Sequence, residues 1–183
     1  MLVLASGSPR RRELLALLGR QFDVVVPDVD ETPRPGEAAT ELVARLARTK
    51  ALTGAAVHHD AVVIGADTSV EVDGAILGKP VDDVDARRML RALSGRIHAV
   101  HTAVAVAADG GVVTATTTSD VTFAALSDAD IAWYLATGEP FDKAGAYALQ
   151  GAGGVFVTTV SGSVSGVLGL PLHETSALLD LCR

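Results

Sequence analysis

Three consecutive arginines occupy the first turn of a helix that the N-terminal sequence predicts: Arg10, Arg11 and Arg12. Ser8 can cap this helix, and Pro9 suits its first position. Because the helix dipole already makes this end positive, each cation there is unfavourable by about 0.3–1 kcal/mol. The arrangement is explained if an anion binds at this end, where backbone N–H groups, guanidinium groups and the hydroxyls of Ser6 and Ser8 can converge on phosphate oxygens. An exposed arginine run without a ligand is the alternative.

Lysine is rare in this chain, which has 12 arginines and 3 lysines. Because arginine serves at most cationic positions, Lys50, Lys79 and Lys143 stand out. A compact ammonium group on a flexible stem suits a phosphate oxygen or a tight pocket better than a planar guanidinium does. These lysines are therefore candidate anion ligands, with ordinary surface lysines as the alternative.

One carboxylate lies beside a predicted buried strand. The apolar run over residues 61–66 leads directly into Asp67, which we expect at the end of its buried part. Burying a carboxylate costs roughly several kcal/mol unless a cation, hydrogen-bond donors or water compensates. A functional site meets that requirement, and a capped strand end is the alternative. Asp30 and Glu31 add carboxylates on an irregular loop over residues 27–36, where an exposed surface is the default.

Other common site patterns do not fit. Residues 74–80 have one residue too few between their glycines for a phosphate loop, and Pro80 stands where a magnesium-binding hydroxyl belongs. The glycines at 151, 153 and 154 miss the dinucleotide-binding spacing and lead into a strand. The five histidines lack zinc-ligand spacing, and no Gly-x-Ser-x-Gly elbow is present. A Rossmann fold, a zinc enzyme and a serine hydrolase are therefore disfavoured.

The composition bounds the fold and the partners. With 183 residues, of which 49% are hydrophobic and 20% charged, the chain can form one domain or two lobes sharing a core. Its net charge of −7 makes nucleic acid or an anionic membrane a poor partner. A single cysteine, Cys182, excludes an internal disulfide, and no secretory signal or membrane span is visible. We expect a cytoplasmic protein.

The elements that must position these residues alternate between strands and helices. Strands are expected at 1–5, 22–26, 61–66 continuing to an Asp73-Gly74 hairpin, on both sides of an Asp109-Gly110-Gly111 turn, and at 155–160. Helices are expected from Pro9 to about Gly19, from Glu37 to Gly54, from Asp82 or Asp83 to about Gly95, from Ser127 to Leu135, and over 173–181. This order without a fixed repeat predicts an α/β fold with a mixed sheet.

Five motifs occur in order along nearly the whole chain: Leu4-Ala5-Ser6-Gly7-Ser8-Pro9-Arg10-Arg11, Gly65-Ala66-Asp67-Thr68, Leu77-Gly78-Lys79-Pro80, Ser94-Gly95 with His98, and Asp142-Lys143-Ala144-Gly145-Ala146-Tyr147 through Gln150-Gly151. With Gly169-Leu170-Pro171 near the end, the chain resembles the Maf family of nucleotide pyrophosphatases. The resemblance implies one Maf-like domain over residues 1–183, with a mixed central β-sheet flanked by helices and two lobes around a cleft, similar to inosine triphosphate pyrophosphatase. It also implies a homodimer.

The resemblance further implies hydrolysis of nucleoside triphosphates to the monophosphate and pyrophosphate with a divalent metal cation, Mg²⁺ or Mn²⁺. Asp67 falls on the family's proton acceptor and, with Glu31, on its metal ligands. The phosphate-binding positions are Ser6, Ser8, Arg10, Arg11, Lys50 and Lys79. The positions associated with base selectivity are Arg10, Thr68 and Gln150.

The motif residues are similar to those of the family branch that acts on dTTP and UTP. Gln150 suits the O4 and N3 edge of thymine or uracil, although an amide that can flip also tolerates cytosine, so CTP and modified pyrimidine nucleotides stay open. At Gly162-Ser163-Val164 the family often carries an acidic and then an aromatic residue, so any role of that carboxylate is absent here. Cleaning of the nucleotide pool and control of division both remain open as cellular roles.

Two other classes of function are compatible with the sequence. A strand followed by a glycine- and arginine-containing loop also begins nucleotidyltransferases, although the Ser8-Pro9 pair argues against one. A non-catalytic nucleotide sensor that regulates cell division is the other alternative. Product analysis with a nucleoside triphosphate and Mg²⁺ separates all three.

Overall fold

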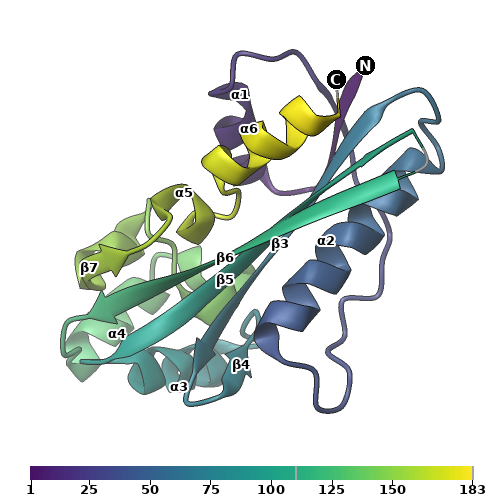
Figure 1. Ribbon diagram of the computed structural model, residues 1–183. Coiled ribbons are helices and arrows are strands. Elements are labelled where there is room, and N and C mark those ends of the chain that lie inside the picture. The colour runs from purple at the N-terminus through teal and green to yellow at the C-terminus, as the bar shows by residue number, and fades with distance from the viewer. Residues whose placement is uncertain (110, 183) are drawn as a thin grey trace.

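One mixed β-sheet organises the protein, whose computed structural model describes residues 1–109 and 111–182. The strands are β1 (Leu2–Ala5), β2 (Asp23–Val25), β3 (Val62–Val72), β4 (Ala75–Leu77), β5 (Ile97–Ala108), β6 (Gly111–Phe123) and β7 (Val157–Ser161). They follow the order β2-β1-β3-β5-β6-β7, with β4 also paired to β3 (Figure 1). The β2, β1 and β3 strands are parallel and the other pairs antiparallel. The predicted mixed sheet is therefore confirmed; Gly110 of the predicted turn lies outside the described residues.

The helices are α1 (Pro9–Ala16), α2 (Ala39–Ala55), α3 (Asp83–Leu93), α4 (Asp128–Leu135), α5 (Val164–Val167) and α6 (Leu172–Leu181), with short 3₁₀ turns η1 (Glu139–Asp142), η2 (Ala144–Ala146) and η3 (Ala152–Phe156). Three of the helices, α1, α3 and α4, begin at the caps that the sequence predicts, whereas α5 was not predicted. Ser8 caps α1, Asp82 caps α3, and Ser127 with Asp130 forms a capping box on α4. Within the described residues, no helix is both long enough and apolar enough to cross a membrane.

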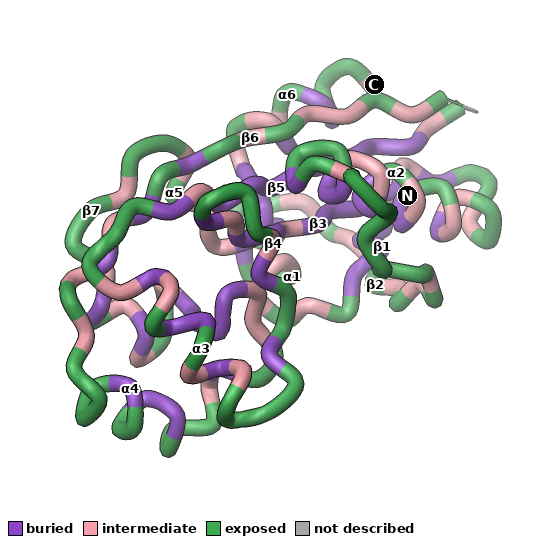
Figure 2. The backbone as a smooth tube through the Cα atoms, turned by 90° about the horizontal axis from the view of Figure 1, so that it is seen from below, coloured by how far each residue is buried: buried purple, intermediate pink, exposed green. Residues whose placement is uncertain are grey.

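Helices cover both faces of the long strands (Figure 1). Alternate residues of β5 face opposite sides: Ala103 and Ala105 pack under α2, whereas Val104 and Val106 pack with Leu178 of α6. A second apolar cluster lies at the other end of β3 and β5, where α3, α4 and η3 cover the sheet. Figure 2 shows that buried segments gather along β3 and β5, which run through both clusters.

Two glycines bring α2 directly onto the sheet. Gly54, which we expected to end this helix, lies one residue before its last residue, Ala55. A Cβ on Gly54 would come 2.8 Å from the Val63 side chain. A Cβ on Gly65 of β3 would lie 2.3 Å from the Ala47 carbonyl oxygen of α2. Neither position has room for a side chain, so the glycines serve helix-to-sheet packing. This close packing carries Lys50 of α2 to the sheet surface.

The sheet has an unpaired edge that defines the site. β1 pairs with residues 62–65 of β3, and β4 pairs with residues 70–72 of the same edge. The β3 strand runs through Asp67 to Val72, which confirms the predicted continuation to the Asp73-Gly74 turn. Residues 66–69 have no strand beside them on that edge within the described chain. Ser6 follows the end of β1 and Lys79 follows the end of β4, so both segments leave the sheet at this gap.

Candidate active site

A cavity of about 890 Å³ lies at this unpaired edge of β3. It is lined by the end of β1, the start of α1, one face of α2, the middle of β3 and the η1 to η3 region. Its lining includes every residue proposed above for catalysis, phosphate, metal or base: Ser6, Ser8, Arg10, Arg11, Glu31, Lys50, Asp67, Thr68, Lys79 and Gln150. Arg12 and Asp30 do not line it. The structure brings the candidates together, and their individual roles stay predictions.

Two carboxylates meet at one buried ammonium group. Lys50 Nζ lies 2.7 Å from Asp67 Oδ1 and 2.6 Å from Glu31 Oε1, and the Lys50 side chain is only 8% exposed. Burial by itself would raise the pKa of Glu31, but the hydrogen bond and charge of Lys50 outweigh it, so this pKa lies below its ordinary value. Lys50 therefore favours the ionised form of Glu31, which lines the cavity.

Arg11 connects three segments on the other face of β3. Because side chains alternate along a strand, Thr68 points away from the face that carries Asp67. The Arg11 guanidinium donates to the Gly169 carbonyl oxygen at 2.8 Å, to Thr68 Oγ1 at 3.2 Å and to Ser6 Oγ at 3.4 Å. Burial lowers the pKa of Arg11, and the Asp67 carboxylate opposes that shift. Arg11 thus holds the start of α1 against β3.

The side chains of Arg10 and Lys79 form no hydrogen bond or ion pair with any described residue, although both line the cavity. Burial lowers the pKa of Arg10, and the nearby carboxylates Asp142 and Glu139 oppose this shift. Lys143, by contrast, is ion-paired with Asp142. Arg10 and Lys79 are therefore cavity cations whose side-chain donors are all unused by the described residues, which suits a ligand with several anionic oxygens.

The hydroxyl hydrogen of Ser6 is available to a ligand beside these cationic side chains. The Ser6 Oγ accepts from the Ser8 backbone N–H at 3.2 Å and from Arg11 at 3.4 Å, and it donates to no described residue. The Ser8 Oγ accepts from the Arg11 backbone N–H at 3.5 Å as the cap of α1. The Ser6 hydroxyl can therefore donate to an anion that docks beside the N-terminus of α1.

Two carboxylates and a tyrosine that line the cavity were missed by sequence reasoning: Glu139, Asp142 and Tyr147. The Gly138-Glu139-Pro140 segment signals a helix end, and nothing local in it indicates a site. Asp142 and Tyr147 belong to a motif that supported the family resemblance, but no role followed from their spacing. Their place in the cavity depends on the packing of η2 against β3 and of η1 against η2.

The residues fit a divalent metal only together with a bound ligand. Among residues 1–109 and 111–182, no group of three or more His, Cys, Asp or Glu side chains could hold a metal ion. Asp67 Oδ2 and Glu31 Oε2 bond to no described residue and remain available. Magnesium is commonly held by one or two carboxylates, with phosphate oxygens and water completing its shell. This pair of carboxylates matches that donor set.

His98 lies behind the cavity wall and should make the stability of the protein depend on pH. It is 2% exposed, its Nε2 lies 2.8 Å from the Tyr147 hydroxyl, and burial lowers its pKa to about 4. An unfolded chain binds a proton on this histidine below about pH 6.5, whereas the folded protein excludes it. Stability should therefore fall as the pH drops from 6.5 to 5, by about 2 kcal/mol.

Urea unfolding of the native protein and of His98→Gln across this range tests that prediction. The carboxylates with lowered pKa values titrate below this window, so the difference between the two proteins isolates His98. The native protein should lose more stability than the variant between pH 6.5 and 5. Parallel curves would contradict a neutral buried His98.

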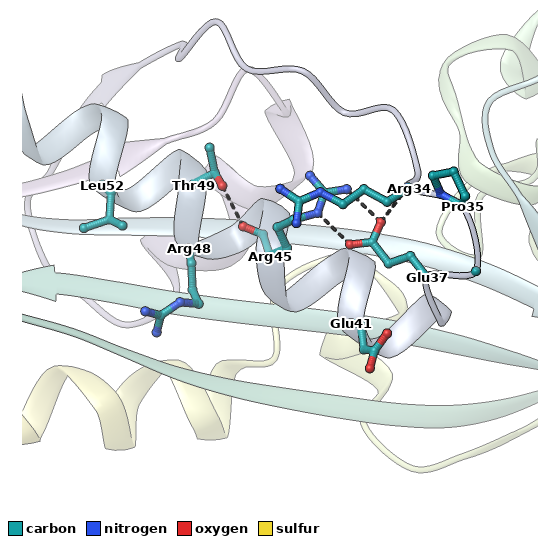
Figure 3. A pocket seen from close by; sticks show the side chains of 9 residues that line it. Arg34, Pro35, Glu37, Glu41, Arg45, Arg48, Thr49 and Leu52 are labelled. Atoms are coloured by element: carbon teal, nitrogen blue, oxygen red, sulfur yellow. Dashed lines mark hydrogen bonds and ion pairs between the residues drawn. The ribbon is translucent and has the colours of Figure 1, made fainter.

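A second hollow, of about 620 Å³, lies away from these residues (Figure 3). It follows the outer side of α2, and its lining contains Arg34, Glu37, Arg45 and Arg48 but none of the candidate site residues. Glu37 points toward Arg45 in Figure 3, and its Oε1 lies 2.6 Å from Arg45 Nε. The hydrogen bond from Arg45 holds the pKa of Glu37 down to about 2. The ion pair with Glu37 accounts for Arg45 at this surface, so no bound ligand is needed to explain it.

The fold and cavity define an α/β protein with a charged cleft at a break in its sheet. The chain belongs to the Maf-like protein family, whose model matches residues 1–182. This finding confirms the family resemblance deduced from the motifs.

Three relatives are each called dTTP/UTP pyrophosphatase. The Anaeromyxobacter dehalogenans (strain 2CP-1) protein is 57% identical over 182 residues, covering 97% of this chain and 92% of the relative. The Chromobacterium violaceum protein is 53% identical over 181 residues, covering 96% and 91%. The Escherichia coli O157:H7 protein is 52% identical over 180 residues, covering 98% and 91%. Among solved structures, the Staphylococcus aureus Ham1 protein matches at 18% identity and a TM-score of 0.48, covering 67% of this chain and 71% of its own.

Proposed function

We propose that this protein hydrolyses dTTP and UTP to the nucleoside monophosphate and pyrophosphate. The observation that carries the proposal is one cavity that is lined both by the unpaired side chains of Arg10 and Lys79 and by the Asp67 carboxylate. The name dTTP/UTP pyrophosphatase, shared by relatives that are 52–57% identical over nearly the whole chain, supports the substrate class. We retain CTP and modified pyrimidine nucleotides as further candidate substrates.

In the proposed reaction, Arg10, Lys79 and the Ser6 hydroxyl bind the oxygens of the triphosphate. Arg11 adds positive charge beneath them and keeps the start of α1 in place. Asp67 Oδ2, which has no hydrogen-bond partner among the described residues, accepts a proton from a water molecule. The water oxygen forms a bond to the α-phosphorus, the bond from that phosphorus to the α–β bridging oxygen breaks, and pyrophosphate leaves. Catalysis then rests on positioning and charge stabilisation.

A divalent cation, Mg²⁺ or Mn²⁺, belongs to this proposal, and Asp67 with Glu31 would hold it. When bound, such an ion neutralises phosphate charge and polarises the phosphoryl oxygens. The ammonium of Lys50 contacts both carboxylates, so its proposed role is to orient both, to keep Glu31 ionised and to face phosphate. Ser8 contributes as the cap of the anion-binding helix.

Base selectivity is assigned to Arg10, Thr68 and Gln150, which all line the cavity. Gln150 can donate to O4 and accept from N3–H of uracil or thymine.

The proposal also includes a single domain over residues 1–183, a homodimer, a cytoplasmic location and the absence of nucleic-acid binding. The net charge of −7 supports the last of these.

A panel of nucleoside triphosphates with Mg²⁺ and pyrophosphate detection tests the proposed function. We expect dTTP and UTP to give the highest kcat/KM, with monophosphate and pyrophosphate formed in equal amounts. No added sugar phosphate should be needed, which separates hydrolysis from nucleotidyl transfer. Tight binding without product would favour the sensor alternative and contradict hydrolysis.

A further inference from the structure

The loop that carries Gln150 has its own anchor. This Gln150 loop, residues 147–151, connects η2 with η3 and contributes to the cavity wall. Gln150 is exposed and bonds to no described residue, so its side chain cannot fix its own position. Whatever holds the backbone on either side of Gln150 therefore sets where its amide meets a base.

The Glu139 carboxylate supplies the hydrogen bonds on one side of the loop. Glu139 Oε1 accepts from the Gly153 backbone N–H at 3.0 Å, and Oε2 accepts from the Ala152 backbone N–H at 2.9 Å. The Tyr134 hydroxyl also donates to Glu139 Oε1, at 2.7 Å. Both carboxylate oxygens are thus used to hold the chain just after Gln150.

Tyr134 extends the same anchor to the other side of the loop. Its buried hydroxyl accepts from the Ala148 backbone N–H at 3.2 Å while donating to Glu139. A Cβ added to Gly151 would lie 2.0 Å from Glu139 Oε2. The carboxylate therefore occupies the space of a side chain at this position, and only glycine lets the loop backbone come so close. Gln150 therefore lies between two segments bound to one polar pair.

We infer that Glu139 is a positioning residue, which acts through Gln150 to set base selectivity in the cavity. The inference rests on the proposed function, because it concerns the choice among its pyrimidine substrates. UTP and CTP differ only at the N3 and C4 edge of the base, so they report on the Gln150 amide without changing the sugar or the triphosphate. A displaced loop should weaken that choice.

Glu139→Gln is the most direct variant. The new amide can still accept at one atom, but its NH₂ group must face a backbone N–H or the Tyr134 hydroxyl that previously met an acceptor. We expect hydrogen exchange at Ala152 or Gly153 to accelerate about tenfold, as one charge-assisted bond is lost. The ratio of kcat/KM for UTP over CTP should fall by a similar factor, about tenfold, because the amide that reads the base is no longer held.

Two further variants separate positioning from general damage. Tyr134→Phe keeps the buried ring but frees the Ala148 N–H, and should change the UTP-to-CTP ratio in the same direction. Glu37→Gln is the matched control: it also removes a carboxylate that accepts a backbone N–H, from Arg34, but lies in the other hollow (Figure 3). It should leave both readouts at their native values.

A double variant tests whether Glu139 acts through Gln150. In a Gln150→Ala background, adding Glu139→Gln should produce no further loss of selectivity. The inference would be overturned if the losses of selectivity from the two single substitutions multiplied in the double variant. It would also be overturned if hydrogen exchange at Ala152 and Gly153 kept its native rate in Glu139→Gln. Failure of the native protein to release pyrophosphate from UTP would instead refute the proposed function, while the exchange measurement would still report on the anchor.

Discussion

Asp67→Asn should lower pyrophosphate release from UTP by about 10³-fold, because an amide cannot accept the proton of the attacking water. The substitution preserves size, and the amide oxygen can still accept from Lys50 Nζ, which lies 2.7 Å from Asp67 Oδ1 in the native protein. The fold of β3 should therefore persist. Steady-state turnover with UTP and Mg²⁺ measures the loss.

Substrate binding should survive this change. Removing a negative charge beside a polyphosphate lowers repulsion, so an α,β-methylene analogue of UTP should bind Asp67→Asn at least as well as the native protein in a calorimetric titration. Asp120→Asn, on the exposed surface of β6 and outside the cavity, is the matched control and should keep native turnover. An active Asp67→Asn protein would remove Asp67 from the proposed role.

Lys50→Met should reduce turnover by about 10²-fold through the two carboxylates that Lys50 contacts. Without its ammonium group, Asp67 and Glu31 face each other as like charges in a half-buried site, which favours protonation of one of them. The pKa of Glu31, now held below its ordinary value, should rise above it. The acidic limb of the pH–rate profile should therefore move to higher pH.

The comparison with Arg48→Met isolates this effect. Arg48 lies on the same helix and is exposed, and it does not line the main cavity, so its loss should change neither turnover nor the pH profile. Thermal melting of both variants establishes that they are folded before rates are compared. If Lys50→Met keeps native turnover with an unmoved acidic limb, the ammonium does not control the carboxylates as described.

The sequence predicts the elements well where local rules decide. Ser8 and Pro9 predict the start of α1, and the positive φ angles of Asp73 and Gly74 match the predicted hairpin turn. Apolar periodicity predicts α2 and α6 to within a few residues of their observed ends. These features depend on neighbours in the chain, so a single sequence contains the necessary information.

Tertiary contacts decide the features that sequence reasoning missed. Gly54 was predicted as a helix end and lies one residue before the end of α2, but its contact with Val63 of β3, which leaves no room for a side chain, has no local signal. Asp67 was expected at the end of the buried part of its strand, but Ser69, Val70 and Val72 beyond it are buried as well, because β5 pairs with the strand on that side. The bonds from Glu139 to residues 152 and 153 join segments that are more than ten residues apart, and no local pattern indicates them.

The candidate site divides in the same way. The sequence alone predicts an anion site, from the unusual placement of Arg10 and Arg11 and from the scarcity of lysine. The contact of Lys50 with Asp67 and Glu31 could not be predicted, because it requires the close packing of α2 on Gly65 and the return of the loop over residues 27–36. The motif resemblance associates these residues with one pocket but not with this ion-pair geometry.

Hydrolysis of UTP in water enriched with ¹⁸O tests the central claim most directly. Attack at the α-phosphorus predicts that the label enters uridine monophosphate and that the released pyrophosphate is unlabelled. Mass spectrometry of both products after partial conversion, with Asp67→Asn as the blank, distinguishes the possible bond cleavages. Label in pyrophosphate, or formation of uridine diphosphate with labelled phosphate, would contradict the proposed reaction.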